Sequence, residues 1–349
     1  MTAPRLRVRK LDIRHGLVDL SHGAGGRASA QLIDEVFRTA FDNPLLDRED
    51  DQAAFDVSAG RMVMSTDSYV ISPLFFPGGD IGSLAVHGTV NDLAMAGAQP
   101  LYLAAGYILE EGFPLVDLQR IAQSMARAAR EAGVAIVTGD TKVVERGKAD
   151  GVFISTTGIG VVPPGLRLSA DRARPGDQVI VSGYIGDHGV AVMSRRRNLG
   201  FETEIQSDSA ALHGLVAHMV TTSAASLRLM RDPTRGGLAS VLNEIAHRSG
   251  VGFLIEEAAI PIRPEVAAAC ELLGLDPLYV ANEGKLLAVV APEGAEALLA
   301  AMRAHPLGRD AALIGTVLED DQRFVQMTTA FGGGRIVDWL VGEQLPRIC

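Results

Sequence analysis

Short β-branched runs alternate with segments of helical periodicity between residues 61 and 162, and this alternation most constrains the fold. Runs of this length and composition are typical of strands. They read RMVMSTDSYVI, LYLAAGYIL, VAIVT and GVFISTTGIGVV. Because helical segments separate the first run from the second and the second from the third, the predicted order is β-α-β-α-β-β.

The two helical segments carry the residues expected at helix ends. Asp80 stands directly before the first segment and can cap its free N–H groups. Gly97 and Gly133 follow the two segments, where glycine commonly ends a helix. The sequence therefore predicts helices at about 81–96 and 114–132.

The second half is predicted to be α+β, and the whole chain is expected to have a two-domain α+β fold. At 349 residues the chain exceeds a typical single domain. Pro163, Pro164 and Gly165 follow a strand-like run and place the boundary near residue 165. Helices are expected near 187–196, 208–219, 237–248, 264–273 and 294–304, and strands near residues 178, 252, 286, 312 and 324.

We expect four parts along the chain: an N-terminal arm (1–19), an N-terminal domain (20–165), a C-terminal domain (166–334) and a flexible tail (335–349). The triplet Gly332, Gly333 and Gly334 predicts a hinge before the tail. Position alone leaves open whether the tail swings toward a site or is an ordinary frayed terminus.

The charge and hydropathy of the chain exclude several classes of partner. A net charge of −10 argues against nucleic acid. No apolar run reaches the roughly 18 residues that cross a bilayer, so no membrane association is expected. The basic residues Arg5, Arg7, Arg9 and Lys10 precede no apolar segment or cleavage site, which favours a solvated arm over a targeting peptide.

The chain has two cysteines, Cys270 and Cys349, too few for the disulfide framework of a secreted domain. We therefore expect a reducing, cytoplasmic location. Cys270 lies at helical spacing from Val266 and Leu273, which predicts a small buried side chain. No such pattern accounts for Cys349, the last residue.

Several aspartates lie in turn-forming stretches. They are Asp51 in EDDQAAF, Asp67 in STDSY, Asp92 in GTVNDLAMAG and Asp140 in TGDTK. Mg²⁺ prefers oxygen ligands and commonly joins carboxylates to nucleotide phosphates, so convergence of these residues would form a metal-phosphate site. Each aspartate alone could equally be a cap or turn former.

The first predicted helix carries His87, Asn91 and Asp92 within apolar sequence. Burying Asn91 and Asp92 without partners would be costly, which favours contact with a ligand or metal. His87 could be either a packed residue or a ligand contact.

Three further segments carry candidate groups. Asp140 and Lys142 follow the run VAIVT, where α/β proteins commonly bind ligands. Asp232 lies in RDPTRGG, which is either an anion site at a helix N-terminus or a capped helix start. Glu283 precedes an apolar run, so burial would raise its pKa as a general base requires. The segment SHGAGGR resembles a phosphate loop only loosely.

The motifs STDSYV, GTVNDLAMAG, TGDTKVV, RDPTRGG and NEGK and the terminal PRIC resemble those of the HypE family of hydrogenase maturation factors. The resemblance covers about residues 20–349. The earlier motifs are shared with aminoimidazole ribonucleotide synthetase, selenophosphate synthetase and thiamine-monophosphate kinase, and PRIC narrows the choice to this family.

The resemblance implies a homodimer whose N-terminal sheets pair into a barrel, with ATP and Mg²⁺ at the domain and subunit boundaries. It implies that HypF carbamoylates Cys349 and that ATP drives dehydration of the thiocarbamate to a thiocyanate. The nitrile would then reach the iron of a [NiFe] hydrogenase through the HypC–HypD complex.

By similarity, the site residues take three roles. Metal or phosphate binding is expected of Asp51, Asp67, Asp92 and Asp140. Nucleotide binding is expected of Thr66, His87, Asn91, Gly139, Thr141, Lys142 and Asp232. The catalytic groups would be Cys349 as acceptor, Glu283 as the base, and Lys142, which would contact the nucleotide or pair with Glu283 and tune it.

Two rival functions share parts of this pattern. A small-molecule kinase or selenophosphate synthetase of the same fold would use the same aspartates, but selenophosphate synthetases carry an N-terminal reactive cysteine or selenocysteine that this sequence lacks. A non-enzymatic carrier would need only Cys349, and the carboxylate and lysine residues argue against it because a carrier needs no ATP site.

Overall fold

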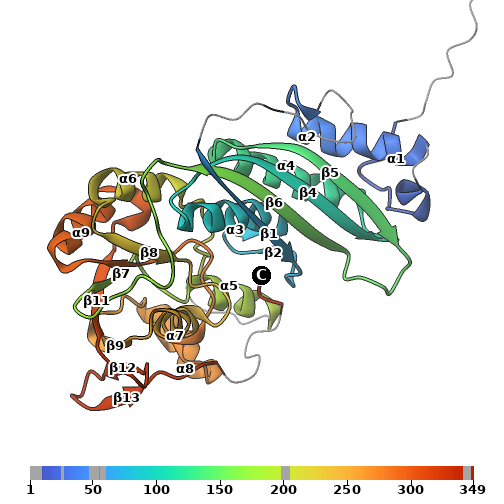
Figure 1. Cartoon of the computed structure of the whole chain (residues 1–349). Helices are drawn as coiled ribbons and strands as arrows, with labels where there is room; N and C mark the ends of the chain where they lie inside the picture. The colour runs from blue at the N-terminus through green and yellow to red at the C-terminus, as the bar shows by residue number, and fades with distance from the viewer. Residues whose placement is uncertain (1–9, 25–26, 47–54, 56–59, 198–204, 341–346) are drawn as a thin grey trace, which may run out of the picture.

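The structure is a computed structural model that describes residues 10–24, 27–46, 55, 60–197, 205–340 and 347–349. Asp51 and the basic residues Arg5, Arg7 and Arg9 lie outside the described residues. The chain forms a four-stranded sheet and a seven-stranded sheet, each with its own helices (Figure 1).

The four-stranded sheet has the predicted β-α-β-α-β-β order, with strands arranged β1-β6-β4-β5. Its strands are β1 (Arg61–Tyr69), β4 (Gln99–Glu110), β5 (Ala135–Val144) and β6 (Val152–Val162). Helices α3 (Ile81–Met95) and α4 (Leu115–Glu131) pack together and cover one face of the sheet. A short hairpin of β2 (Phe75–Phe76) and β3 (Gly79–Asp80) leads into α3.

The predicted helix ends are confirmed. The Asp80 side chain accepts hydrogen bonds from the N–H groups of Gly82 at 2.8 Å and Ser83 at 3.1 Å. Gly97 and Gly133 follow the two helices with φ values of 72° and 66°, where residues other than glycine are strained.

Alternation along β1 sorts its side chains between the helix-covered face and the opposite face of the sheet. Asp67 and Tyr69 face the helices, whereas Met64 and Thr66 face the other way. Met64 is 73% exposed on that uncovered face. Asp67 and Thr66 are therefore neighbours in sequence that serve different surfaces.

A helical segment before the sheet was not predicted. It comprises η1 (Leu20–Gly23), α1 (Arg27–Leu32), the π-helical turn η2 (Ile33–Arg38) and α2 (Thr39–Phe41). Its apolar residues pack on the sheet and on α4. The ring centroids of Phe37 and Tyr107 are 4.5 Å apart. The spacing of Leu32, Val36 and Phe37 was the available helical signal.

The seven-stranded sheet has the order β13-β12-β9-β11-β7-β10-β8 and is antiparallel except for the pair β12 and β9. Its strands are β7 (Gln178–Val181), β8 (Leu227–Arg231), β9 (Gly252–Glu256), β10 (Leu287–Val290), β11 (Ala312–Leu318), β12 (Val325–Thr328) and β13 (Gly334–Ile336). The five expected strands are present, and β8 and β13 were missed.

Helices lie on both sides of this sheet. They are α5 (Asp187–Arg196), α6 (His213–Ser223), α7 (Gly237–Ser249), α8 (Pro264–Leu273) and α9 (Ala295–Ala304). Short 3-10 turns occur at Glu257–Ala259, Pro277–Tyr279, Pro292–Gly294 and Pro306–Gly308. One apolar core packs α7 around the buried Phe253, and another joins α6 and α9 through Met219 and Leu298.

Two sequence predictions for this half were wrong. The helix expected near 208–219 begins at His213, because residues 207–212 form tertiary hydrogen bonds instead. The expected tail from residue 335 does not start as a free segment, since Gly334–Ile336 pair with β12 and Val337 is buried.

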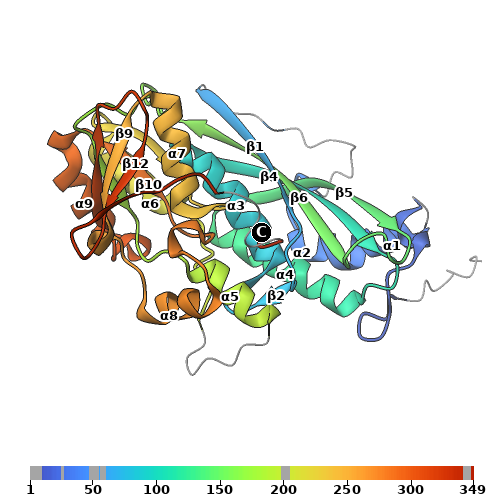
Figure 2. The same cartoon turned by 90° about the horizontal axis from the view of Figure 1, so that it is seen from below.

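The C-terminus lies between the two halves of the molecule, close to α5 and β2 in both views (Figures 1 and 2). Ile348 is only 3% exposed there. The last residues are thus docked against the protein rather than frayed.

No helix in the described part of the chain is long and apolar enough to span a membrane.

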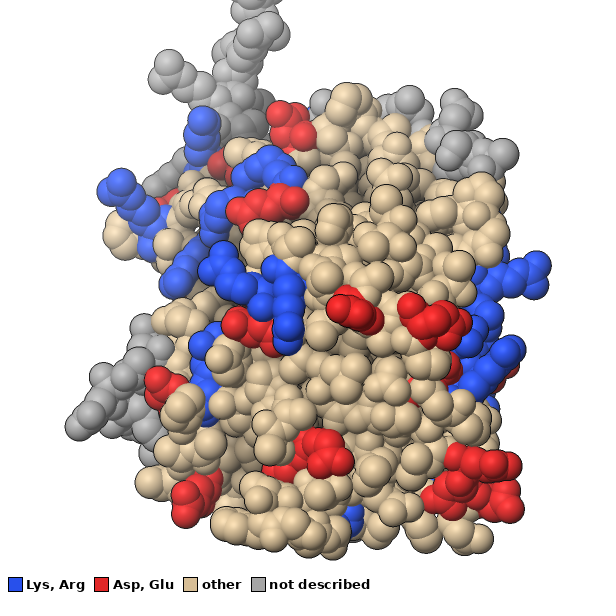
Figure 3. Space-filling model, turned by 90° about the vertical axis from the view of Figure 1, so that its left-hand side faces the viewer, with Lys and Arg blue, Asp and Glu red and all other residues tan. Residues whose placement is uncertain are grey.

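The left-hand side of the molecule shows basic side chains gathered in one band with acidic groups around it (Figure 3). Most of the rest of that visible face carries neither charge.

Candidate functional site

Five carboxyl groups from both halves of the chain interact with one another, and we call them the carboxylate cluster. They are Asp67, Asp92, Asp208, Asp232 and Glu283. Asp67 comes from β1 and Asp92 from α3, whereas the other three come from loops that precede α6, α7 and β10. The fold thus concentrates negative charge where its two halves meet.

Asp67 and Asp92 form the N-terminal part of the cluster. The hydroxyl of Tyr69 donates to Asp67 Oδ2 at 3.2 Å, and Ser65 Oγ donates to Asp92 Oδ2 at 2.5 Å. Burial, followed by the neighbouring Asp67, raises the pKa of Asp92 against the lowering effect of Ser65. Two of the four predicted metal or phosphate ligands are therefore adjacent.

Glu283 is buried at 3% exposure, and its Oε1 has no hydrogen-bond partner among the described residues. Burial raises its pKa well above the ordinary value, and the surrounding aspartates raise it further. The predicted rise in the pKa of Glu283 is confirmed. A desolvated carboxylate of this kind binds a proton strongly, as a base acting on a weakly acidic N–H must.

Asp208 holds the loop that carries Glu283. Its Oδ1 accepts the N–H of Glu283 at 3.1 Å, and its Oδ2 accepts the N–H of Gly284 at 3.3 Å. Lys285 Nζ lies 3.2 Å from Asp208 Oδ2, and both side chains are largely buried. This ion pair therefore fixes the backbone on both sides of the candidate base.

Asp232 is the cluster member that directly follows β8, in the loop that leads to α7. Burial, with the nearby Asp92 as the next cause, raises its pKa to about 7. Helix α7 begins after Gly236, and no side chain caps its N-terminus. Asp232 is therefore not the cap of this helix, one of the two roles its motif allowed.

Asn91 joins α3 to the C-terminal half. Its Nδ2 donates to the carbonyl oxygens of Ala210 at 3.0 Å and Glu283 at 3.1 Å, and its Oδ1 accepts the N–H of Leu212 at 2.8 Å. The predicted cost of burying Asn91 is thus met by protein partners. Its expected contact with a nucleotide stays a prediction.

His87 is a partly buried residue of α3, and its Nδ1 lies 2.9 Å from Ser209 Oγ. Burial lowers its pKa from 6.5 to about 4, with a smaller contribution from His213. The ring is therefore neutral at physiological pH and contacts the loop that precedes α6.

Asp140 and Lys142 lie on β5, at the edge of the sheet opposite to β1, away from Asp67 and Asp92. Lys142 Nζ is 3.0 Å from Asp140 Oδ2, and both side chains are about two-thirds exposed, at 66% and 68%. The Lys142 hydrogen bond lowers the pKa of Asp140. In the structure Lys142 thus pairs with Asp140, not with Glu283 as the sequence analysis allowed.

The pairing register explains why Asp140 is separate. Asp140 aligns with Ser68, through Gly106 and Ser155, on the face opposite to Asp67. Three strand spacings lie between β1 and β5, which is roughly 14 Å. The predicted group of four aspartates is therefore divided within one chain, and Asp51 lies outside the described residues.

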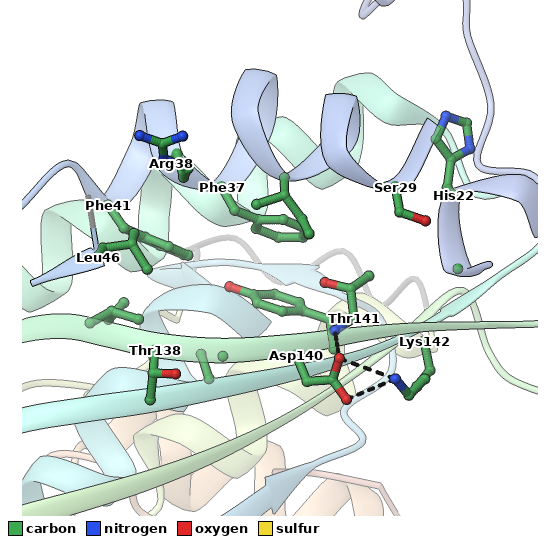
Figure 4. Close-up of a pocket in the computed structure, with 16 residues that line it drawn as sticks. His22, Ser29, Phe37, Arg38, Phe41, Leu46, Thr138, Asp140, Thr141 and Lys142 are labelled. Carbon is green, nitrogen blue, oxygen red and sulfur yellow. Dashed lines mark hydrogen bonds and ion pairs between the residues drawn. The ribbon is translucent and has the colours of Figure 1, made fainter. Parts of the chain in front are cut away.

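A pocket of about 210 Å³ lies between the edge of the four-stranded sheet and the preceding helical segment (Figure 4). Gly139, Thr141 and Lys142 line it from β5, and Phe37 and His22 line it from the opposite side. The segment SHGAGGR, which loosely resembles a phosphate loop, contributes His22 and Gly23 to this pocket. Part of that segment therefore borders residues that are candidates for nucleotide binding. Thr66 lies elsewhere, bonded to Thr157 Oγ1 at 2.9 Å.

No three histidine, cysteine or carboxylate side chains in the described ranges converge closely enough to hold a metal by themselves. The donor set nevertheless fits a magnesium-nucleotide complex, because Mg²⁺ commonly takes one or two carboxylates and fills its shell with phosphate oxygens and water. Asp67 and Asp92 are two such carboxylates. Glu283 Oε1, which has no hydrogen-bond partner among the described residues, shows that this region holds more acceptor oxygens than donors.

The last residues of the chain dock beside the end of β1. The N–H of Val70 donates to a main-chain oxygen of Cys349 at 3.3 Å, and the N–H of Ser72 donates to the carbonyl oxygen of Arg347 at 3.2 Å. Ile348 is a buried member of the large apolar cluster to which Ala281 also belongs. The terminal cysteine thus lies beside the end of the strand that carries Asp67.

Several residues of this region were not predicted from the sequence. Asp208 and Lys285 fix the Glu283 loop, Tyr69 contacts Asp67, and His188 contacts the docked terminus. The polar triplet Ser207-Asp208-Ser209 and the lysine of NEGK were the available signals. Their partners lie far along the chain, so spacing alone could not reveal them.

Family models match both halves of the chain. The N-terminal domain of AIR synthase related proteins matches residues 49–162, and the C-terminal domain matches residues 174–328. A carbamoyl dehydratase HypE from Rhizobium leguminosarum bv. viciae is 73% identical over 341 residues, covering 98% of this chain and 97% of the relative. The chain belongs to the HypE family of carbamoyl dehydratases.

Other members of the HypE family support this assignment. The Escherichia coli K12 carbamoyl dehydratase HypE is 48% identical, with 95% of this chain and 99% of the relative covered. A crystal structure of HypE in complex with ATP superposes with a TM-score of 0.91 at 51% identity, covering 95% and 99% of the two chains. The predicted family and enzyme class are confirmed.

Two further solved structures are similar to this chain, one from the HypE family and one from outside it. HypE in a HypE–HypF complex matches with a TM-score of 0.78 at 51% identity, covering 88% of this chain and 99% of that one. Thiamine-monophosphate kinase from Stenotrophomonas maltophilia K279a matches with a TM-score of 0.63 at 21% identity, covering 90% and 98%, and shares the fold alone.

Proposed function

We propose that the chain dehydrates an S-carbamoyl group on its own Cys349 to a thiocyanate, with ATP as the co-substrate. The nitrile would supply the cyanide ligand of a [NiFe] hydrogenase. The docking of the terminus carries this proposal, because Cys349 pairs with Val70, three residues after Asp67 in β1. The reacting group would thus be part of the same chain as the site.

The proposed reaction transfers the carbamoyl oxygen to phosphate. The amide oxygen attacks the γ-phosphorus of ATP, and ADP leaves. Loss of the two N–H protons and departure of the O-phosphate then leave the S–C≡N group, with inorganic phosphate as the second product. Phosphorylation matters because an amide oxygen is otherwise a poor leaving group.

Glu283 is the proposed base for the nitrogen proton. Its raised pKa makes its carboxylate a strong proton acceptor, and the ion pair of Asp208 and Lys285 fixes its loop. Burial and the neighbouring aspartates both favour the protonated form of Glu283. Positive charge beside the cluster would favour the carboxylate form that acts as the base.

Mg²⁺ bound with ATP would supply that charge and neutralise the transferring phosphate. We propose Asp67 and Asp92 as its ligands, with Asp51 and Asp140 as further metal or phosphate contacts. Asp232 and His87 would line the nucleotide site beside them. The adjacency of Asp67 and Asp92 supports the first pair.

Lys142, Gly139, Thr141 and Thr66 are proposed to contact the nucleotide. The separation of the Asp140–Lys142 pair from Asp67 supports a site shared between two subunits, since one chain alone keeps these groups on different faces. We propose a homodimer that pairs the uncovered faces of the four-stranded sheets into a barrel. Exposed Met64 lies on that face.

The chain is further proposed to divide near residue 165, with sheets of different order on the two sides. HypF is the proposed carbamoyl donor, supported by the relative solved in a HypE–HypF complex. The HypC–HypD complex is the proposed acceptor of the cyanide group.

Mass spectrometry of the C-terminal peptide would test this function. After incubation with HypF, carbamoyl phosphate and ATP, we expect a nitrile adduct on Cys349 and none on Cys270. A Cys349→Ala chain should carry no adduct and should not support hydrogenase maturation. A Cys349→Ala chain that still matured the hydrogenase would contradict the proposal.

A further inference from the structure

The terminal residues pair with a short stretch that follows β1. Val70 and Ser72 donate their N–H groups to the main-chain oxygens of Cys349 and Arg347, which is an antiparallel register. Arg347 has a φ of 54°, a conformation that residues other than glycine rarely adopt. Such a backbone persists only when surrounding contacts hold it.

His188 of α5 provides one of these contacts. The ring is fully buried, and its Nε2 lies 2.8 Å from the carbonyl oxygen of Ile348. Because a carbonyl oxygen only accepts, Nε2 carries the proton and Nδ1 accepts from Ser207 Oγ, 2.8 Å away. Ser207 Oγ also accepts the N–H of Ser209 at 3.1 Å, and this contact leaves its own proton available for His188.

Arg196, at the end of the same helix, provides the second contact. Its Nη2 donates to the carbonyl oxygen of Arg347 at 2.6 Å, and its Nε donates to that of Ser72 at 2.7 Å. One guanidinium group therefore joins the terminus to the stretch with which it pairs. Hydrogen bonds from charged donors are stronger than neutral ones.

We propose that His188 and Arg196 are positioning residues that hold the C-terminal residues through their main-chain carbonyl groups and so place Cys349 beside the end of β1. His188 binds the carbonyl group of Ile348, and Arg196 binds the carbonyl group of Arg347. The two residues therefore hold consecutive main-chain groups just before Cys349. Neither contact involves the Cys349 side chain. A carbamoylated or cyanated cysteine therefore keeps both.

The His188 contact also reaches the loop of the candidate base. Ser207 is bonded to the ring, and the next residue, Asp208, binds the backbone N–H groups of Glu283 and Gly284. Docking of the terminus and placement of Glu283 thus share one short loop. Loss of the His188 donor is expected to lower the turnover number without changing the KM for ATP, and this part rests on the proposed function.

Alkylation of the two cysteines by iodoacetamide tests the docking without ATP or a carbamoyl donor. Cys349 packs against the apolar core, so it should react more slowly than the same thiol in a free peptide ending in PRIC. We expect the His188→Ala chain to label Cys349 about fivefold faster, and the Arg196→Ala chain about tenfold faster. Mass spectrometry gives both rates.

Cys270 serves as an internal control for folding. It is 1% exposed, and burial raises the pKa of its thiol to about 11, so it should stay unlabelled while the chain is folded. If iodoacetamide labels both cysteines of a variant, that variant has unfolded. The Cys349 labelling rate of His188→Gln is then used in its place. The amide of His188→Gln keeps a donor near the position of Nε2 and should restore protection to within about twofold.

Arg195→Ala is the matched control for Arg196→Ala, because Arg195 is the exposed neighbour on the same helix. It should label at the wild-type rate. Equal Cys349 rates in wild-type, His188→Ala and Arg196→Ala chains would overturn the docking role and leave the dehydration reaction intact. Faster labelling with no nitrile formed by the wild-type chain would support the docking role and contradict the proposed function.

Discussion

Asn91 on α3 donates a hydrogen bond of 3.1 Å to the backbone carbonyl of Glu283, 192 residues later in the chain. The same amide group also contacts Ala210 and Leu212. One buried side chain thus holds two segments of the C-terminal half, the loop before α6 and the Glu283 loop, against the first long helix. The position of the candidate base therefore depends on a residue of the N-terminal half.

Replacing Asn91 with alanine should lower the free energy of unfolding by about 2–4 kcal/mol, because three backbone groups lose a buried partner. Urea denaturation measures this loss. Gln123→Ala, an exposed polar residue on α4, is the control and should change stability by less than about 0.5 kcal/mol. An Asn91→Ala chain as stable as wild type would show that these contacts contribute little.

Glu283→Gln should change the pH dependence of stability. The folded pKa of Glu283 lies above the unfolded value of 4.5, so the folded chain binds a proton that the unfolded chain has released. Its contribution to stability is therefore present below pH 4.5 and is lost as pH rises toward the folded pKa. Glutamine cannot titrate, so the variant should gain stability over wild type between pH 5 and pH 8.

The free energies of unfolding of the two chains, measured in urea at both pH values, test this sign. Replacing Glu265, an exposed glutamate at the start of α8, by glutamine is the control and should leave the pH dependence unchanged. A constant difference in the free energy of unfolding between wild type and Glu283→Gln would mean that Glu283 ionises normally.

Dehydration by Glu283→Gln should stop before nitrile formation while ATP still binds.

His87 should destabilise the chain in acid. Its pKa is about 4 when folded and 6.5 when unfolded, so its contribution to stability is present above pH 6.5 and is lost as pH falls toward 4. The stability difference between wild type and His87→Gln should shift against wild type by up to about 2 kcal/mol between pH 7 and pH 5. Other titrating groups cancel in this difference, and no shift would contradict the neutral buried ring.

Lys142→Met should affect activity far more than stability. The ion pair with Asp140 is exposed, and such pairs contribute about 0–1 kcal/mol. If Lys142 contacts the nucleotide, the KM for ATP should rise about tenfold or more, as expected for the loss of a charged hydrogen bond. Lys148→Met, an exposed lysine in the next loop, is the control, and equal kinetics in both variants would remove Lys142 from the site.

Local patterns determined the β-α-β-α-β-β order, the helix ends at Asp80, Gly97 and Gly133, and most elements of the second half. These features depend on spacings of a few residues, which the sequence displays directly. The early helical segment and β8 were missed although their apolar positions are visible. The terminal PRIC pointed to the family that the comparisons confirmed.

Only the tertiary structure decided which polar residues meet. Strand register placed Asp67 and Asp140 on opposite faces, although both come from similar turn-like motifs. Docking of the chain end brought His188 to Ile348 across 160 residues, and burial raised the pKa of Glu283. The sequence by itself determined local geometry and the identity of Cys349 as a candidate, whereas contacts between distant segments set its surroundings, because packing and register have no local signature.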